Sequence, residues 1–457
     1  MTLPSYFFAD LPPEATLSPA MLREACRTLK RNREQYLAGR TTDHLMKVLI
    51  GVAEGWHQPE NPFRQLALAQ GPAKTGFSRA TLERGLDKFF KPFARENLHV
   101  LLAQELGEAR CLDGMCPALA EPHRHRMAMA MGPEFLVHIT AGNIPNPTLM
   151  SIALGLLIRS AQFVKCARGS SFLPRLFAHS IYDFDHKLGA CLEIAEWRGG
   201  NAALEEALFA EADGVTATGS DEALTAIRAK LPVKTRFIGY GQRVSFGYVA
   251  SEVLSARSAE KIATGAGEDV IAWNQLGCLS PHVVYVQRGG DVVPRRFAEL
   301  LADELERREA TEPRGDLPAE SAASIASRRA IYEVRAAHSL DTHLWRSANS
   351  TAWTVIYEED ARFQMSCLHR FIYVKAVADL AEALRAAAPV RGSVSTVGIA
   401  VPNDQAQETA MCLARWGATR VCPLGQMQNP PLTWRHDGRP TLGDLVTWTD
   451  FETGDGR

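Results

Sequence analysis

The sequence predicts an α/β fold with two lobes, on the basis of three observations. The chain has 457 residues, more than one hydrophobic core usually organises, so two large lobes are expected. Hydrophobic residues make up 46% of the chain, which is enough for substantial cores. Short β-rich runs alternate twice with helix-length segments, a pattern typical of βαβ units around parallel sheets. We therefore expect a Rossmann-like cofactor lobe followed by an α/β catalytic lobe.

Residues 1–125 are predicted to form a mostly helical segment that packs on the cofactor lobe. From about residue 19 to residue 107, apolar residues recur at spacings of three and four, which is the helix period; examples are Leu45, Val48, Leu49 and Val52. Breaks between helices are expected at Pro59, Pro62 and Gly71-Pro72.

Strand-like runs mark the two lobes. Residues 126–255 are predicted to be a Rossmann-like cofactor-binding domain, with runs at 135–139, 163–165 and 214–217. Residues 256–425 are predicted to be the catalytic domain, with runs at 283–286, 354–357 and 371–374. A charged stretch at 307–329 is interpreted as a solvated helix-loop insertion, and residues 426–457 as a C-terminal segment.

Charge and cysteine content exclude several classes of protein. The net charge is −2, so no general basic field favours nucleic acid, and the longest apolar stretch is too short to span a bilayer. The nine cysteines form no CxxC pair, which predicts reduced thiols and not a disulfide scaffold. With no basic, apolar leader at the start of the sequence, we expect a cytoplasmic protein.

Cys278 is the strongest candidate for a nucleophile. It stands in a glycine-preceded turn just before the strand-like run 283–286. A thiol in such a loop can be partly exposed, and nearby backbone N–H groups favour its thiolate. The alternative is a buried structural thiol, the usual state of a free cysteine.

The segment around Cys278, with the sequence NQLGCLSPH at 274–282, resembles the cysteine motif of the LuxC family. This family contains acyl-CoA or acyl-protein reductases and belongs to the aldehyde dehydrogenase superfamily. Further segments resemble superfamily or LuxC motifs in the same order along the chain: AGNIP at 141–145, FVK at 163–165, TATGS at 216–220, IGYG at 238–241, LGQMQ at 424–428 and WRHDG at 434–438. The resemblance covers roughly residues 130–450 and implies an aldehyde dehydrogenase-like fold.

The resemblance also implies a nicotinamide cofactor, although the sequence contains no complete GxGxxG fingerprint. Lys165 matches the lysine that contacts the adenosine ribose. Arg168 stands where many NAD-preferring relatives have a ribose-binding glutamate, and it could pair with a 2′-phosphate, so NADPH is the expected cofactor. Gly219 and Ser220 match the phosphate-binding turn. The alternatives are a surface arginine at position 168 and a simple serine N-cap at position 220.

Two further positions bear on the chemistry. Asn143 matches the asparagine whose amide stabilises the thiohemiacetal oxyanion, although an Asn- and Pro-rich turn needs no functional explanation. Gly239 occupies the loop in which hydrolytic aldehyde dehydrogenases carry a glutamate that activates water. The resemblance therefore implies an acyl-cysteine that resists hydrolysis and accepts hydride.

Other polar residues are weaker candidates. His282 and His436 are candidate acid/base groups, and Glu358 or Glu359 could contact the nicotinamide ribose, although both glutamates are expected to face solvent. The thiols, together with His123 and His125, have no metal-ligand spacing, so no metal is expected.

The function expected from these residues and from the resemblance is NADPH-dependent reduction of a fatty or other acyl thioester to an aldehyde, through acyl-Cys278. The alternatives are an aldehyde dehydrogenase that works in the oxidising direction and a non-redox acyl-carrying subunit of a complex. The expected partners are acyl-CoA, an acyl carrier or an acyl-protein synthetase subunit, and further copies of the chain in a dimer or tetramer. Chain length and donor thiol stay open.

Overall fold

The computed structural model describes residues 3–12, 14–117 and 126–452. Contacts divide the chain into two compact α/β units. Unit 1 comprises the described residues within 1–75, 86–241 and 431–457, and unit 2 comprises 76–85 and 242–430. Unit 2 starts before the expected boundary at residue 255, because strand β8 (Val244–Val249) pairs with β9 (Pro281–Gln287). Of the other two expected boundaries, the one at residue 125 lies outside the described residues, and the one at residue 425 falls shortly before the end of unit 2 at Pro430.

A five-stranded parallel sheet organises unit 1. Its strand order is β5-β4-β3-β6-β7, with β3 (Phe135–Ile139), β4 (Ala161–Cys166), β5 (Leu192–Glu196), β6 (Gly214–Thr218) and β7 (Arg236–Tyr240). Strands β3, β4 and β6 contain the runs predicted from the sequence. Helices cover both faces of the sheet, so nearly every residue of β3 and β4 is buried, which explains why these strands read as continuous apolar runs.

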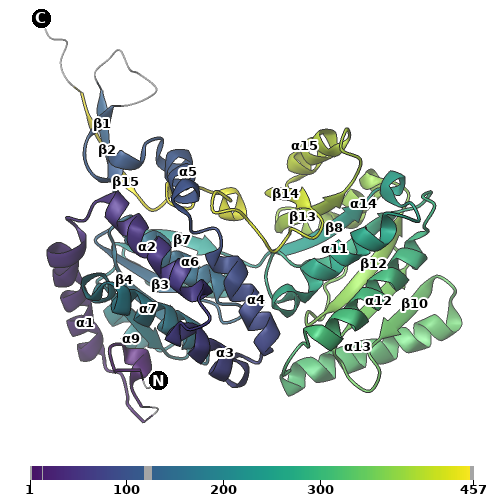
Figure 1. Cartoon of the computed structure of the whole chain (residues 1–457), viewed down its shortest axis with the longest axis horizontal. Helices are drawn as coiled ribbons and strands as arrows, with labels where there is room; N and C mark the ends of the chain where they lie inside the picture. Colours follow the sequence, from purple (N-terminus) through teal and green to yellow (C-terminus); the bar gives the residue numbers. More distant parts are fainter. Residues whose placement is uncertain (1–2, 13, 118–125, 453–457) are drawn as a thin grey trace, which may run out of the picture. The chain divides into compact units, whose positions relative to one another are not determined.

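Two sets of helices cover the unit 1 sheet (Figure 1). On one face, apolar residues of α1 (Pro19–Asn32) and α9 (Ala202–Phe209) pack against Phe135, Val137 and Phe163. The other set includes α2 (Thr42–His57), α6 (Asn146–Leu157) and α7 (Phe172–Phe184), and the Trp56 indole of α2 donates a 2.9 Å hydrogen bond to Ser180 Oγ of α7. Residues Leu45, Val48, Leu49 and Val52 are all buried in α2, as the helical spacing predicts.

The remaining helices of the N-terminal part differ from expectation at one point. Helix α3 (Pro62–Thr75) continues through Pro72, so the break predicted at Gly71-Pro72 is wrong. Pro72 lies in the last turn, where the loss of one backbone donor disturbs little of the helix. The N-terminal part also contains α4 (Arg79–Phe90) and α5 (Arg95–Leu106). Later in the chain, unit 1 contains α8 (His186–Gly189) and α10 (Asp221–Lys230). A separate antiparallel sheet joins β1 (Cys116–Pro117), β2 (Met127–Met131) and β15 (Thr447–Phe451).

Unit 2 contains a seven-stranded sheet in the order β10-β11-β12-β9-β8-β13-β14. Only the edge strand β10 pairs antiparallel, with β11. Besides β8 and β9, the strands are β10 (Thr342–Arg346), β11 (Thr354–Glu358), β12 (Phe371–Val377), β13 (Val394–Ala400) and β14 (Arg420–Pro423). Strands β9, β11 and β12 contain the three runs predicted for this lobe.

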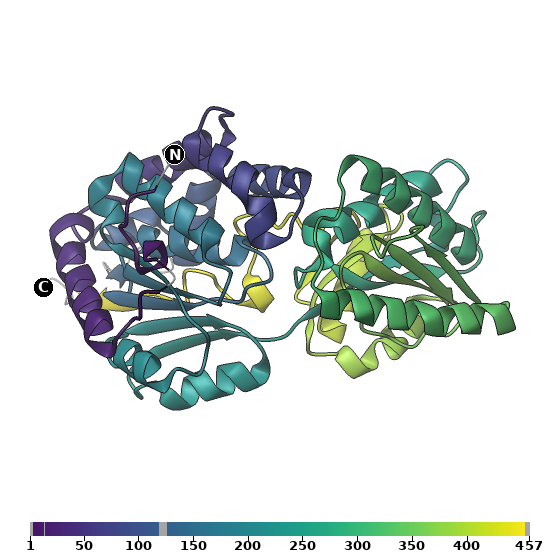
Figure 2. The same cartoon turned by 90° about the horizontal axis from the view of Figure 1, so that it is seen from below.

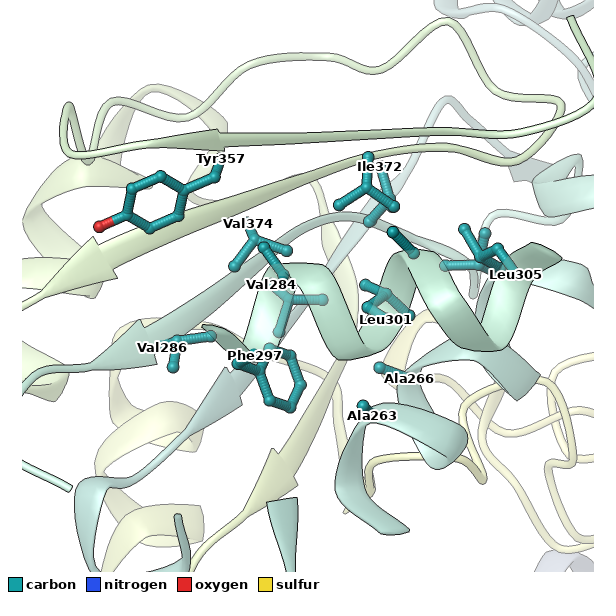
Figure 3. Packing of buried hydrophobic residues seen from close by; sticks show 14 of the residues in the cluster. Ala263, Ala266, Val284, Val286, Phe297, Leu301, Leu305, Tyr357, Ile372 and Val374 are labelled. Carbon is teal, nitrogen blue, oxygen red and sulfur yellow. The ribbon is translucent and has the colours of Figure 1, made fainter. Parts of the chain in front are cut away.

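Helices pack on both faces of the unit 2 sheet. Helices α11 (Ala259–Ile271) and α12 (Pro294–Thr311) cover one face, where Phe297, Leu301 and Leu305 contact valines and isoleucines of β9 and β12 (Figure 3). Helix α13 (Ala319–His338) lies along the other face, as Figure 2 shows, and α14 (Leu380–Ala386) and α15 (Ala406–Trp416) complete this layer. In the part of the chain that the structure describes, no helix is long and apolar enough for a membrane crossing.

The charged stretch 307–329 is mostly exposed and consists of helix and loop, as expected, but a few of its charged residues are buried. It consists of the end of α12, a short connection and the first half of α13. Glu312 and Arg314 in the connection are buried, and Glu312 pairs with Arg308 at 2.8 Å and with Arg84 at 2.7 Å. Glu312 is buried between two arginines, and the Arg314 guanidinium donates to the carbonyl and hydroxyl oxygens of Thr351. A sequence pattern does not reveal such contacts.

Candidate active site

The residues expected to bind the cofactor gather at the carboxyl edge of the unit 1 sheet. The chain first forms β3, β4 and β5 in one direction across the sheet. It then crosses back and adds β6 and β7 on the other side of β3, so the strand order reverses between β3 and β6. Ligands of open α/β sheets bind outside the carboxyl ends of the strands at such a switch point. Asn143 follows β3 and Gly219 follows β6, and these two strands flank the switch point.

The loop that carries Asn143 lies against the loop that carries Arg168. A Cβ atom built on Gly142 would lie 3.4 Å from the Cβ of Ser170 and 3.5 Å from the Cβ of Ala167. The Asn143 side chain is exposed and forms no hydrogen bond with any other described residue. Its amide is therefore available to a ligand.

Lys165 is the penultimate residue of β4 and is only 6% exposed. Its Nζ lies 5.6 Å from the centre of the Trp197 ring, within the range of a cation–π interaction. Burial lowers the pKa of Lys165, and the nearby carboxylate of Glu205 opposes this shift. An ammonium group so poorly hydrated would be stabilised by the oxygen atoms of a ligand.

Arg168 is exposed in the turn after β4. This turn is held by Glu196, a residue that was not predicted from the sequence. Glu196, the last residue of β5, accepts hydrogen bonds from the backbone N–H of Gly169 at 2.6 Å and of Ser171 at 3.2 Å. Gly169 has φ of 81°, a conformation that suits glycine. Glu196 pairs in register with Cys166 of β4, so its place at the end of a neighbouring strand could have identified it.

Gly219 and Ser220 connect β6 to α10. Ser220 is the N-cap of this helix, and its Oγ accepts a 3.3 Å hydrogen bond from the Ala223 N–H. Ser220 therefore caps the helix, as the alternative of a simple serine N-cap describes. The remaining N–H groups of the first turn point out of the helix end beside the switch point, where a phosphate could bind.

His436 packs against an aromatic residue of unit 1. Its ring stacks on Tyr240 with centroids 4.3 Å apart and an angle of 13° between the planes. Trp434 lies on the same histidine at 4.7 Å. This stacking favours a structural role for His436 over an acid/base role.

Cys278 belongs to unit 2 and lies half-buried in a tight turn between η5 (Ala272–Gln275) and β9. The turn is closed by a 3.0 Å hydrogen bond from the Ser280 N–H to the Gly277 carbonyl oxygen. Ser245 Oγ of β8 donates a 2.7 Å hydrogen bond to the carbonyl oxygen of Cys278. Both contacts involve the backbone, so they fix the conformation of the turn that carries Cys278.

The segment before this turn has an unusual backbone. Trp273, Asn274 and Gln275 all lie in the left-handed region, with φ of 50°, 52° and 65°. Each such residue costs roughly 1 to 2 kcal/mol, so the surroundings must hold the segment in place. Gln275 does so: its amide donates to the carbonyl oxygens of Pro281 at 2.8 Å and Phe371 at 2.9 Å, and accepts from the Phe371 N–H at 2.8 Å.

A second left-handed segment faces the first. Leu368, His369 and Arg370 have φ of 60°, 53° and 66°. Arg370 Nε donates a 3.1 Å hydrogen bond to Asn274 Oδ1, so the two strained segments are joined directly. Backbone strain of this kind clusters at functional sites, and here the strained segment Trp273 to Gln275 directly precedes the turn that carries Cys278.

His282 lies four residues after Cys278 and is almost fully buried. Its Nδ1 is 3.0 Å from Ser366 Oγ and 3.1 Å from the Ser366 backbone nitrogen. Burial lowers the pKa of His282 to about 4, so the imidazole is neutral at pH 7. A neutral ring that accepts a backbone N–H is better suited to holding the loop than to supplying a proton.

The expectation that Glu358 and Glu359 both face solvent is wrong for Glu358. Glu358 is 1% exposed, and its carboxylate lies 2.9 Å from Lys375 Nζ and 2.8 Å from an Arg335 nitrogen. Glu359 is partly exposed and pairs with Arg288. The buried carboxylate thus belongs to an ion-pair cluster, which the short sequence signal could not reveal.

Other thiols in the chain differ from Cys278 in their surroundings. Burial raises the pKa of Cys26, Cys166 and Cys191 to about 12, so these thiols are protonated at neutral pH. Among the residues described, no group of three or more His, Cys, Asp or Glu side chains could hold a metal ion. His123 and His125 lie outside the described residues.

Comparison with known proteins adds to this geometry. Residues 37–448 match the family described as acyl-CoA reductase (LuxC). The chain is 23% identical to the long-chain acyl-protein thioester reductase of Aliivibrio fischeri over 426 residues, covering 90% of this chain and 82% of the relative. It is 22% identical to the protein of the same name from Photorhabdus laumondii subsp. laumondii, with the same coverage.

Solved structures agree on the fold. The Δ-pyrroline-5-carboxylate dehydrogenase of Mycobacterium tuberculosis aligns with a TM-score of 0.69 at 14% identity, over 96% of this chain and 83% of that one. A benzaldehyde dehydrogenase of Corynebacterium glutamicum aligns with a TM-score of 0.68 at 13% identity, over 96% and 91%. The predicted aldehyde dehydrogenase-like fold is therefore confirmed.

Proposed function

This chain belongs to the acyl-CoA reductase (LuxC) family, and from that premise we propose that it reduces a fatty or other acyl thioester to the aldehyde with NADPH. The acyl group would pass through a covalent intermediate on Cys278. The relatives' names favour a thioester donor, which would be acyl-CoA or an acylated carrier or synthetase protein. A homo-oligomer and a cytoplasmic location stay predictions.

The observation that carries this proposal is the setting of Cys278. Cys278 is half-buried in a backbone-fixed turn directly before β9, whereas Cys26, Cys166 and Cys191 are buried and protonated. The Cys278 thiolate would bond to the acyl carbon, and the bond from that carbon to the donor sulfur would break. The departing thiol takes up a proton. The Asn143 amide would donate to the oxyanion that forms.

The unit 1 site fits a nicotinamide dinucleotide. Lys165 would contact the adenosine ribose, Arg168 a 2′-phosphate, and the Gly219-Ser220 turn with the first turn of α10 the pyrophosphate. When bound, NADPH would supply the hydride that, with one proton, converts acyl-Cys278 to aldehyde and free thiol. Gly239 offers no carboxylate to activate water, which favours reduction over hydrolysis.

The test uses the wild type, Cys278→Ala and the control Cys367→Ala, because Cys367 is another half-buried thiol of unit 2. Each protein is mixed with acyl-CoAs of increasing length, first without and then with NADPH. Intact mass and aldehyde formation are measured. We expect acylation of wild type and Cys367→Ala at Cys278, followed by aldehyde release with NADPH.

Each rival function gives a different result in this test. An acyl-carrying subunit would be acylated but would release no aldehyde with NADPH. An enzyme of the oxidising direction would instead convert added aldehyde to acid with NADP⁺ and would release free acid from acyl-CoA. Acylation that persists in Cys278→Ala would contradict the proposed nucleophile.

A further inference from the structure

The segment Leu424–Gln428, which follows β14, has no role in the function proposed so far. Asp269 of α11 is fully buried and accepts hydrogen bonds from the backbone N–H groups of Gly425 at 2.5 Å and Met427 at 2.9 Å. Arg420 donates to the carbonyl oxygens of Met427 at 2.6 Å and Gln426 at 2.9 Å. Side chains therefore hold the backbone of this loop from both sides.

Close packing adds to these hydrogen bonds. Gly425 has φ of 94°, and a Cβ atom there would lie 3.0 Å from the Cα of Gly265 in α11. Met427 is fully buried, and its Sδ would lie 2.6 Å from a Cβ atom built on Gly398 of β13. The loop therefore packs tightly against α11 and β13. Because its backbone is fixed in this way, the position of Gln428 is fixed too.

Gln428 reaches from this loop to the turn that carries Cys278. Its Nε2 donates a hydrogen bond to the hydroxyl of Ser280. Ser280 is 1% exposed and stands two residues after Cys278, and its N–H closes the turn by bonding to Gly277. Loss of the Gln428 donor would leave the buried hydroxyl of Ser280 without this partner, which costs stability in the turn.

We propose that Gln428 is a positioning residue for acyl transfer, which acts on Cys278 through Ser280. The inference rests on the proposed function of Cys278 as the acylated nucleophile. The attack on a thioester needs the sulfur on a defined line to the carbonyl carbon, and small displacements reduce its rate strongly. A small alkylating reagent makes no such demand, because it depends on the thiolate fraction and on access.

The experiment is a double-mutant cycle of Gln428→Ala, Ser280→Ala and the double variant. The control is Gln426→Ala, which changes an exposed side chain of the same loop whose amide oxygen contacts Asn429. Two rates are measured on each protein by mass spectrometry: single-turnover acylation of Cys278 by an acyl-CoA that acylates wild type, and alkylation by iodoacetamide. Melting temperature is recorded on the same samples.

We expect acylation to slow by about tenfold in Gln428→Ala and in Ser280→Ala, and by no more in the double variant, because both remove one contact. Alkylation should stay within about twofold of wild type, and Gln426→Ala should match wild type in both rates. Normal acylation of Gln428→Ala, additive losses in the double variant, or equal losses in both rates would overturn the inference. Failure of wild type to be acylated at all would instead overturn the proposed function.

Discussion

Arg439 Nη2 donates a 2.6 Å hydrogen bond to the carbonyl oxygen of Gly239. The guanidinium carbon of Arg439 also lies 5.1 Å from the centre of the Tyr240 ring, on which His436 stacks. The C-terminal segment thus contacts the end of β7 through a hydrogen bond, a cation–π contact and a ring stack. Gly239 stands at the position where, according to the resemblance, hydrolytic aldehyde dehydrogenases carry a water-activating glutamate.

The variant Gly239→Glu should lose stability without gaining hydrolysis. A Cβ atom at this position would lie 3.1 Å from Phe237 Cε1 and 3.2 Å from Leu224 Cδ1, so neighbouring side chains must move. We expect a loss of about 1 to 3 kcal/mol in the free energy of unfolding, measured with urea. Free acid released from the acyl-enzyme should not rise.

A matched control for this variant is Gly39→Glu, since a Cβ atom at Gly39 meets nothing within 4 Å. Its free energy of unfolding should change by less than about 0.5 kcal/mol. A stable Gly239→Glu protein that hydrolyses its acyl-enzyme rapidly would show that the end of β7 accepts a glutamate in a working position.

The parts of the fold that local pattern determines were predictable from the sequence. Strands β3, β4 and β6 are buried on both faces, so their continuous apolar runs are visible without a structure. The same holds for the residues that follow these strands, because parallel strands end at one edge of the sheet. Asn143 and Gly219 are therefore placed at this edge by topology alone.

Contacts between distant segments could not be predicted. Glu196 binds a turn 25 to 27 residues away, and Gln428 binds a serine 148 residues away. Glu358 appears as one of two adjacent acidic residues in the sequence, and only the fold brings Lys375 and Arg335 to it. The left-handed backbone of Trp273 to Gln275 has no glycine signal, because tertiary hydrogen bonds maintain it.

Arg168→Glu should reduce the preference for NADPH over NADH. The substitution removes a charge-assisted contact to a 2′-phosphate and adds a carboxylate beside Glu196. Both changes weaken NADPH binding, so we expect kcat/KM for NADPH to fall by roughly 10- to 100-fold. The ratio of kcat/KM for the two cofactors measures the effect. Arg257→Glu, the same charge change at an exposed residue of unit 2, should leave this ratio unchanged. An unchanged ratio in Arg168→Glu as well would show that Arg168 is a surface residue.

Stability should fall in acid because of buried neutral histidines such as His138. Burial lowers the pKa of His138 to about 4, against 6.5 for an ordinary histidine, and its ring contacts Thr216 Oγ1 at 2.6 Å and Gln162 Oε1 at 2.9 Å. Between these two values the unfolded chain binds a proton that the folded chain does not. Stability is therefore complete above pH 6.5 and declines as the pH falls toward 4, by about 3 kcal/mol for this residue.

The check for His138 is urea unfolding of wild type and His138→Asn at several pH values between 4 and 7. The substitution has its own cost at every pH, so the informative quantity is the difference in slope. The variant should lose less stability than wild type on acidification. Parallel curves would mean that His138 is protonated to the same extent in the folded and unfolded chains.

Asn143→Ala should reduce the rate of acyl transfer while leaving the fold intact. The side chain is exposed and forms no hydrogen bond within the described structure, so its removal should shift the free energy of unfolding by less than about 0.5 kcal/mol. Its amide would bond to an oxygen that is neutral in the thioester and negative in the tetrahedral intermediate, so the bond strengthens as charge develops. We expect a loss on the order of 10²- to 10³-fold in the acylation rate, with NADPH affinity unchanged. Asn403→Ala, at an exposed asparagine of unit 2, serves as the control and should behave as wild type. A lower melting temperature with near-normal acylation in Asn143→Ala would show that this asparagine only shapes its turn.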